Sequence, residues 1–327
     1  MVVADDVPLG RSLRLERPLH LRRTLGPLVQ GGRDPAARFD GDVLWRATRT
    51  PAGPGTLRVE VRPASGSVDA QAWGRGAGWL LDHLPDIVGA SDDEGDFPDR
   101  AARHPVVAEL RRRAPGVRIP RTTAVLELLI PVVLAQKVTG LEAHHSYRRL
   151  VTALGSPAPG PAAPPLLVPP AAEVLAATPA WRFHHFGVEA RRAATLRVAA
   201  GSAGRLEALS GLPADAARTR LMALPGIGPW TAAEVARLAL GDADAVSIGD
   251  YHLPDQVGWA LAALPRSDDA TMLRLLEPFR GHRARVLRLI EVAGPTPPRY
   301  GPRMTPASVR GTAWAAERSP RRRGNAR

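Results

Sequence analysis

The chain has 327 residues, 44% of them hydrophobic, a formal net charge of +12 and no cysteine. The lack of cysteine excludes disulfides, thiolate zinc sites and cysteine-ligated iron–sulfur clusters, and no apolar run approaches the roughly 20 residues that span a bilayer. The charge favours a polyanionic partner, but Lys137 is the only lysine, and the abundance of Arg, Ala, Pro and Gly is also typical of a GC-rich genome.

The first part of the chain, up to about residue 98, has the pattern of β-structure. The segments DVLWRATRT (42–50) and GTLRVEVRPASGSVDAQAW (55–73) alternate apolar and polar residues and include β-branched ones, as half-buried antiparallel strands do. The acidic stretch GASDDEGDFPDR (89–100) has the composition of a linker.

Helical spacing begins near residue 101. The mostly apolar segment 123–138 predicts a buried central helix, and 142–154 predicts a second helix. The proline-rich stretch 155–170 cannot be helical and predicts a connection. Further helices are expected over 171–178, 188–200, 214–223, 231–240, 255–264, 270–277 and 282–292.

These patterns together predict an α+β fold in three parts. Residues 1–98 form a small β-rich N-terminal domain, residues 99–296 form an all-helical domain, and residues 297–327 form a basic tail. The tail contains Arg321, Arg322 and Arg323, and its composition predicts disorder and weak binding to phosphate.

Between two of the predicted helices lies a short turn with two glycines, LPGIGPWTA (224–232). A tight helical hairpin needs a positive φ, which glycine adopts without strain, and Pro229 suits the first turn of the following helix. Gly226 and Gly228, having no side chain, also expose backbone N–H groups at a helix N-terminus, where the helix dipole favours phosphate. An ordinary connection between helices is the alternative interpretation.

This hairpin resembles that of the helix-hairpin-helix DNA glycosylases and, within them, of the 3-methyladenine DNA glycosylase II branch. Four other segments agree with the family pattern. They are VSIGDYHLPDQV with Asp250 before Tyr251, PGVRIPRT (115–122) followed by VLAQKVTG (133–140), FGVEARRAATL (186–196) and RGHRARVLRLI (280–290). The resemblance covers roughly residues 100–295 and implies that residues 99–296 are the glycosylase domain.

The resemblance implies an enzyme of base excision repair that removes a damaged, alkylated purine from DNA. Such a base is flipped out of the stack before its N-glycosidic bond is broken through an oxocarbenium-like sugar. Asp250 matches the catalytic carboxylate of the family, which stabilises that cation or polarises the attacking water. Its position just before a predicted helix is also that of an ordinary N-cap, which is the alternative interpretation.

The hairpin position at which bifunctional members of the family carry a Schiff-base lysine is Trp230 in this chain, so the resemblance implies a monofunctional enzyme without strand cleavage. Trp230 and Tyr251 are candidates for the walls of the base pocket, where an aromatic ring stacks on the extruded base. Packing in the core is the alternative for both. Glu234 and Glu291 stand where the branch often has further pocket aromatics, which departs from a pocket that selects electron-poor purines.

Contacts with DNA are implied for the two hairpin glycines and for Gln136, Lys137 and Arg283. Where the family has an apolar wedge after the glutamine, this chain has Lys137, which can reach a phosphate or the orphaned base, and Val138 is the alternative wedge. The resemblance also implies that the hairpin carbonyls hold a monovalent cation that bridges to phosphate. No other cofactor is implied.

The two histidine pairs, at 144–145 and 184–185, do not predict a metal site, because adjacent helical residues point about 100° apart and no cysteine is present. The expected partner is double-stranded DNA, the expected state is a monomer, and no membrane is involved. The N-terminus lacks a signal-peptide pattern, so the expected location is the cytoplasm, at the nucleoid when DNA is bound.

Two other functions fit parts of the sequence. A non-catalytic helix-hairpin-helix DNA-binding protein is the main alternative, because Lys137, Glu234 and Glu291 depart from the family pattern. A basic RNA-binding module is the second, but the stacked-aromatic sheet motif expected of it is missing.

Overall fold

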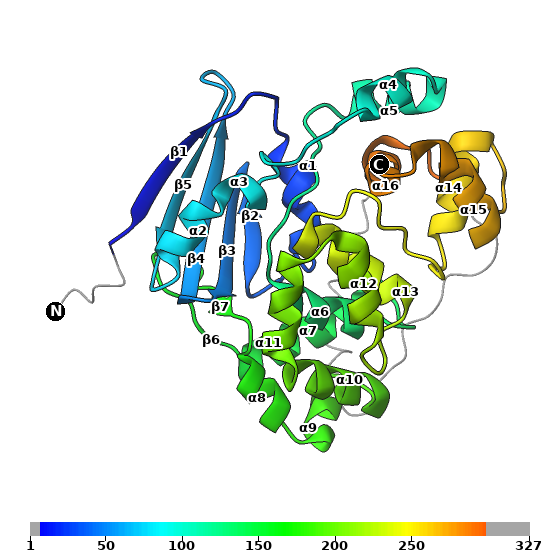
Figure 1. The fold of residues 1–327 in the computed structure, drawn as a ribbon. Coiled ribbons are helices and arrows are strands. Elements are labelled where there is room, and N and C mark those ends of the chain that lie inside the picture. Colours follow the sequence, from blue (N-terminus) through cyan, green and yellow to red (C-terminus); the bar gives the residue numbers. More distant parts are fainter. Residues whose placement is uncertain (1–6, 299–327) are drawn as a thin grey trace, which may run out of the picture.

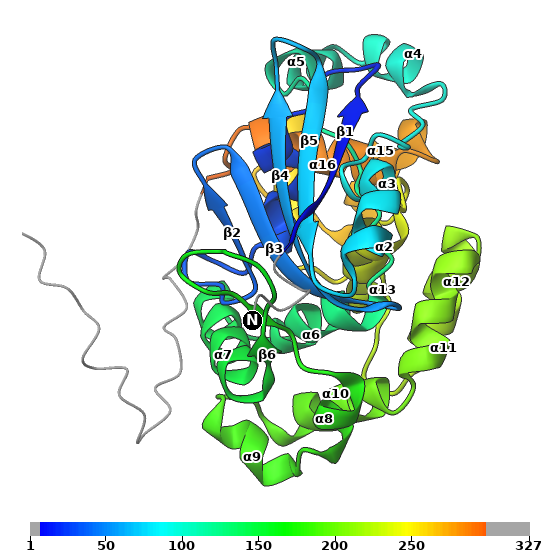
Figure 2. The same ribbon diagram turned by 90° about the vertical axis from the view of Figure 1, so that its left-hand side faces the viewer.

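The structure, a computed structural model, describes residues 7–298. The predicted basic tail with Arg321, Arg322 and Arg323 lies, apart from residues 297 and 298, outside the described residues. Figure 1 shows a sheet on one side of the molecule and helices on the other, so the fold is mixed, with an antiparallel sheet followed by many helices. In the perpendicular view of Figure 2, α4 and α5 lie at one end of the molecule and α8 to α10 at the other.

The sheet has five antiparallel strands in the order β1-β5-β4-β3-β2. Both predicted strand segments are confirmed, because 42–50 becomes β3 and 55–73 becomes most of the hairpin of β4 and β5. The two edge strands β1 and β2 are too short and too rich in charge to be recognised by alternation. The strands are β1 (Leu9–Arg14), β2 (Ala37–Asp40), β3 (Val43–Thr50), β4 (Gly53–Arg62) and β5 (Ser67–Trp73).

Helix α6 (Val125–Leu134) is the buried central helix that the sequence predicts, although it is shorter than 123–138. It begins after Thr123, which has φ 55°, and the Glu207 carboxylate caps it by accepting hydrogen bonds from the Val125 and Leu126 N–H groups at 2.9 and 3.0 Å. It contacts the π-helical turn Ala236–Leu240 and four α-helices. The four α-helices are α7 (Gly140–Leu154), α10 (Ala190–Ala200), α11 (Ala203–Glu207) and α13 (Pro229–Val235).

Most of the other predicted helices are present within a few residues of their expected bounds. The segment 231–240 is an exception, because α13 begins at Pro229 and passes at Ala236 into a π-helical turn that ends at Leu240. The proline-rich connection 155–170 contains two very short paired strands, β6 (Ser156–Pro157) and β7 (Leu167–Val168). The remaining α-helices are α1 (Leu21–Leu25), α2 (Ala77–Asp82), α3 (Leu84–Ile87), α4 (Phe97–Ala102), α5 (Pro105–Arg113), α8 (Ala172–Ala177), α9 (Ala180–His185), α12 (Ala214–Met222), α14 (Leu253–Ala262), α15 (Asp269–Leu276) and α16 (Arg283–Ala293).

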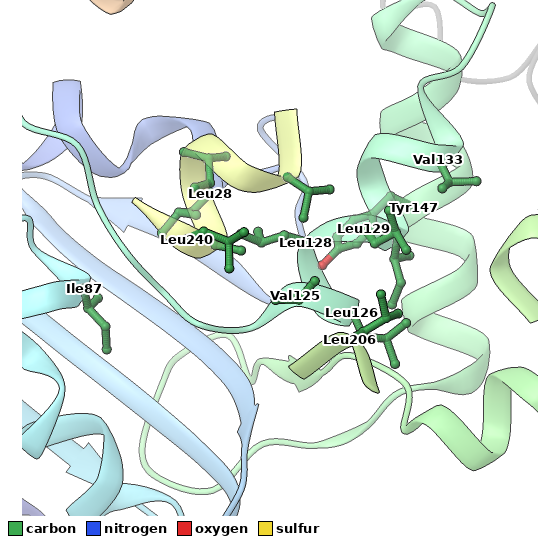
Figure 3. Packing of buried hydrophobic residues seen from close by; sticks show 14 of the residues in the cluster. Leu28, Ile87, Val125, Leu126, Leu128, Leu129, Val133, Tyr147, Leu206 and Leu240 are labelled. Atoms are coloured by element: carbon green, nitrogen blue, oxygen red, sulfur yellow. The ribbon is translucent and has the colours of Figure 1, made fainter. Parts of the chain in front are cut away.

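The buried apolar residues form two large clusters. The first core joins the inner face of the sheet to the helices between α6 and α13, and Figure 3 shows part of it, where Leu128 and Leu129 of α6 lie close to Leu240 and Tyr147. The second core joins α4 and α5 to α14, α15 and α16. The second core groups residues 97–114 with 246–290, and the first core joins residues 19–88 to 125–240 across residue 98. The domain boundary at residue 98 stays a prediction.

The acidic stretch 89–100 connects the two cores but is not a free linker. Asp92 forms an ion pair with Arg285 of α16 at 2.5 Å, and both side chains are more than nine-tenths buried. Asp92 also accepts a hydrogen bond from the Ile119 N–H at 3.0 Å. The acidic composition therefore has a structural cause that the sequence pattern missed. Among residues 7–298, no helix is both long and apolar enough to cross a membrane.

Candidate functional site

The glycine turn joins α12 to α13 as a helical hairpin, with Pro229 at the first helical position. Gly226 has φ +85°, and a Cβ added there would lie 2.0 Å from Oγ1 of Thr195 on α10. Ile227 is 5% exposed and plugs into the first core. Gly226 is therefore required both by the backbone conformation and by the close approach of α10.

Gly228 has a different role from Gly226. Its φ of −96° and ψ of −177° are extended backbone, which any residue adopts, so the expectation that the turn needs a positive φ applies to Gly226 alone. A Cβ added to Gly228 would meet nothing within 4 Å. Gly228 thus leaves open space at the N-terminus of α13, where backbone N–H groups have no helical partner.

Gln136 links the end of α6 to the hairpin. Its Nε2 donates to the carbonyl oxygen of Gly226 at 3.0 Å and to Oγ1 of Thr231 at 2.9 Å. The next residue, Lys137, is exposed and has φ 57°, and Val138 is half-buried. The structure therefore brings these predicted DNA contacts to one side of the hairpin, with Gln136 turned toward the protein and Lys137 toward solvent.

Asp250 accepts three hydrogen bonds. The indole Nε1–H of Trp230 donates to Oδ2 at 2.8 Å, and the His252 and Leu253 N–H groups donate to Oδ1 at 2.7 and 2.8 Å. The N-cap of α14 is His252 and not Asp250, but one oxygen of Asp250 accepts from the first two N–H groups at the start of this helix, and the other oxygen is tied to the hairpin helix α13. This structural role is compatible with a catalytic one.

The two aromatic candidates for the pocket differ in position. Trp230 is half-buried, and its bond to Asp250 fixes the edge of the ring, so it lies neither fully in the core nor free to turn. Tyr251 is 88% exposed and contacts the ring of His252 edge-on, with the ring centroids 4.8 Å apart. Tyr251 therefore does not line an enclosed pocket in this conformation.

A charged cluster fills the space between α13 and α16 near the Asp250 loop. Arg237 donates from Nη1 to Oε1 of Glu291 at 2.6 Å and from Nη2 to Oε2 of Glu234 at 3.2 Å. Burial acts to lower the pKa of Arg237, but the two carboxylates outweigh it and raise that pKa above its usual range. Glu234 and Glu291 are predicted from the sequence only as departures from the family pattern, and they are partners of Arg237, which no sequence pattern indicates.

Arg283 is bound within the protein. Its Nε and Nη2 donate to Oδ1 and Oδ2 of Asp244 at 2.8 and 2.5 Å, in a bidentate pair between α16 and the loop that leads to Asp250. Burial opposes ionisation of Asp244, but these hydrogen bonds hold its pKa below the usual value. The DNA contact implied for Arg283 stays a prediction, and the structure shows a second use for the same guanidinium.

Two other features lie outside this site. Within residues 7–298, no three His, Asp or Glu side chains gather in an arrangement that would hold a metal ion. A cavity of about 520 Å³ lies between α4, α5 and α16, and its rim includes Arg17 and Arg111, both paired with Glu94. None of the predicted site residues lines this cavity.

The arrangement of these elements is the fold of the helix-hairpin-helix DNA glycosylases. A 3-methyladenine DNA-glycosylase from Archaeoglobus fulgidus superposes with a TM-score of 0.73 at 17% identity, over 86% of this chain and 97% of that one. An 8-oxoguanine glycosylase/lyase from Clostridium acetobutylicum, in complex with double-stranded DNA, superposes with a TM-score of 0.67 at 13% identity, over 88% of this chain and 97% of that one. At these identities the likeness concerns the fold.

A likeness in sequence points within that class to the alkylated-base branch. The Mycobacterium tuberculosis protein named "Probable bifunctional transcriptional activator/DNA repair enzyme AlkA" is 36% identical over 143 residues, which are 43% of this chain and 28% of the relative. The match thus spans little more than a quarter of that relative. No family model matches this chain. The resemblance stated from the hairpin and the Asp-Tyr pair is confirmed.

Proposed function

We propose that this protein is a DNA glycosylase that flips a damaged, alkylated purine out of duplex DNA and hydrolyses its N-glycosidic bond without cleaving the strand. The observation that carries the proposal is the position of Asp250, a carboxylate that accepts three hydrogen bonds, beside the hairpin helix. The fold of the solved glycosylases and the likeness to the AlkA relative support the same reaction class.

The chemistry follows from charge. As the base leaves, the sugar develops positive charge at its anomeric carbon, and a fixed carboxylate stabilises that charge without having to reorganise. The bonds from the start of α14 and from the indole hold both oxygens of Asp250 in place, so its orientation is set before DNA arrives. Water completes the hydrolysis, with Asp250 as the group that polarises it.

The DNA-binding part of the proposal rests on the hairpin. The open backbone around Gly228 would receive a phosphate at the N-terminus of α13, and Lys137 would contact the strand on the other side of Gln136. A monovalent cation would bind the hairpin carbonyls, where the Gly226 oxygen accepts one hydrogen bond and keeps a second lone pair. The protein would act as a monomer in the cytoplasm.

A second candidate, a non-catalytic DNA-binding protein with the same hairpin, is favoured by the exposure of Tyr251 and by the charged cluster around Arg237. Of the two predicted pocket aromatics, only Trp230 is then held against Asp250.

Release of a free base distinguishes the two candidates. Duplex DNA that has been methylated, deaminated or oxidised would be incubated with the protein, and the released bases identified by mass spectrometry. We expect alkylated purines from the parent and, in the same time, amounts lower by about 100-fold or more from Asp250→Asn. Strong duplex binding with no released base from any of the three substrates would support the non-catalytic candidate instead.

A further inference from the structure

The charged cluster around Arg237 joins the two cores next to Asp250. Arg237 lies on the π-helical turn after α13, whose neighbours Val235, Ala236 and Leu238 belong to the first core. Glu291 lies on α16, where Leu289 and Ile290 belong to the second core. The 2.6 Å bond between the two side chains therefore crosses from one core to the other.

The same cluster also holds the loop that carries Asp250. Ser247, which is 4% exposed, donates from Oγ to Oε1 of Glu234 at 2.5 Å, while Oε2 of Glu234 accepts from Arg237. One helical turn earlier on α13, Trp230 bonds to Asp250 itself. Helix α13 thus bonds to the loop at Ser247 and at Asp250, three residues apart in the loop. Arg237 orients the Glu234 carboxylate that binds Ser247.

We infer that Arg237 is a positioning residue for Asp250: it holds Glu234 and Glu291 in place, and through them it fixes the Asp250 loop and α16 relative to the hairpin helix. This inference rests on the proposed function only for its effect on rate. The effect of Arg237 on the position of the Asp250 loop is a structural claim, and it can be tested without DNA.

The energetics of burial explain why one arginine can have this effect. The side chain of Arg237 is 10% exposed, and those of Glu234 and Glu291 are 23% and 25% exposed. Without the arginine, two carboxylates would face each other and the nearby Asp250 in a site with little solvent, and like charges in such a site repel strongly. Arg288, which donates to the other oxygen of Glu291 at 2.8 Å, offsets only one of them. The loop would then move away from α13.

The test compares two buried arginines. Arg237→Met removes both ion pairs of Arg237. Arg46→Met is the matched control, because Arg46 on β3 is also buried and pairs with a single carboxylate, Glu127 of α6, at 2.5 Å. The readouts are the single-turnover excision rate, the affinity for duplex DNA and the indole N–H resonance of Trp230. That resonance is identified by its loss in Trp230→Phe.

We expect Arg237→Met to bind DNA within about twofold of the parent but to excise about 10-fold to 100-fold more slowly, as a misplaced catalytic group does. The Trp230 resonance should shift and exchange faster with solvent, and Arg237→Lys should restore part of both losses. Arg46→Met should change neither. If Arg237→Met does not fold, Glu291→Gln, which keeps the shape of the side chain but weakens the bond between the cores, should give smaller changes in the same direction.

An unchanged Trp230 resonance in folded Arg237→Met would overturn the inference, even if the rate fell, because Arg237 would then act on the substrate directly. A parent that releases no base would overturn the proposed function instead. The resonance would still show in that case whether Arg237 positions the Asp250 side chain.

Discussion

Asp250 has a structural role at the start of α14 that also suits the catalytic role proposed for it. Its Oδ1 satisfies the free N–H groups at the start of α14, while its Oδ2 accepts from the indole of Trp230. These bonds fix the carboxylate, and fixing the carboxylate is what electrostatic stabilisation of a sugar cation requires. At this residue, a structural role supports the proposed chemical one.

Asp250→Asn tests the charge. The amide oxygen can still accept from the start of α14, but the amide nitrogen then faces the indole N–H, so one bond is lost together with the charge. We expect single-turnover excision to fall about 100-fold or more, with DNA affinity kept or slightly raised. Trp230→Phe is the control, since it loses the same bond but keeps the charge, and it should cost about tenfold at most. Asp250→Asn acting at the parent rate would contradict the assignment.

The hairpin position of Trp230 also bears on strand cleavage. A tryptophan cannot form a Schiff base, and the only lysine, Lys137, lies at the end of α6. We therefore expect no cleavage at abasic sites and no adduct on borohydride reduction. A trapped protein–DNA adduct that disappears in Lys137→Ala would show that the lysine reaches the abasic sugar. One that persists would point to the N-terminal amine.

At the scale of elements, one hairpin glycine is needed for the fold and the other leaves the backbone accessible to a ligand. Gly226 adopts the left-handed conformation that lets α10 approach, and Gly228 keeps the N-terminus of α13 open. Gln136 then fixes the hairpin to α6, the central helix. The nine-residue motif is therefore held by contacts with two other helices, α10 and α6.

Valine substitutions at the two positions should separate these roles. Gly226→Val should lower the free energy of unfolding by more than about 1 kcal/mol, because of its positive φ and its collision with Thr195. Gly228→Val should cost about 1 kcal/mol or less, as a poorer N-cap, yet weaken duplex binding at low salt. Chemical unfolding and fluorescence anisotropy measure the two quantities. Unaltered affinity in folded Gly228→Val would argue against phosphate binding at the N-terminus of α13.

At the scale of the whole molecule, ion pairs between distant segments set how the two cores meet. Asp92 with Arg285, Asp244 with Arg283 and Glu291 with Arg237 all attach α16 to other parts of the chain. Many arginines are thereby used inside the protein. Each of these ion pairs adds nothing to the net charge of +12, so the excess positive charge comes from residues outside them.

The salt dependence of binding tests how Lys137 uses its charge. If it contacts a phosphate, Lys137→Ala should weaken binding about equally for all duplex sequences and reduce the slope of log K against log salt by about one. Arg62→Ala is the control, because Arg62 is half-exposed on β4 and paired with Asp69. An unchanged slope in Lys137→Ala would favour Val138 as the residue that enters the DNA.

The sequence by itself determined the features that act over a few residues. The alternation in 42–50 and 55–73, the apolar run of α6, the glycines and proline of the hairpin and the aspartate before α14 all work locally, so their patterns are legible. Only the tertiary structure decided which of the two glycines needs a positive φ, since that depends on Thr195 of α10. It also decided the partners of Arg237 and Arg283, the indole bond to Asp250 and the grouping of 97–114 with 246–290. These features join segments 20 to about 190 residues apart, and their pairing follows from how all the helices pack, which no local pattern encodes.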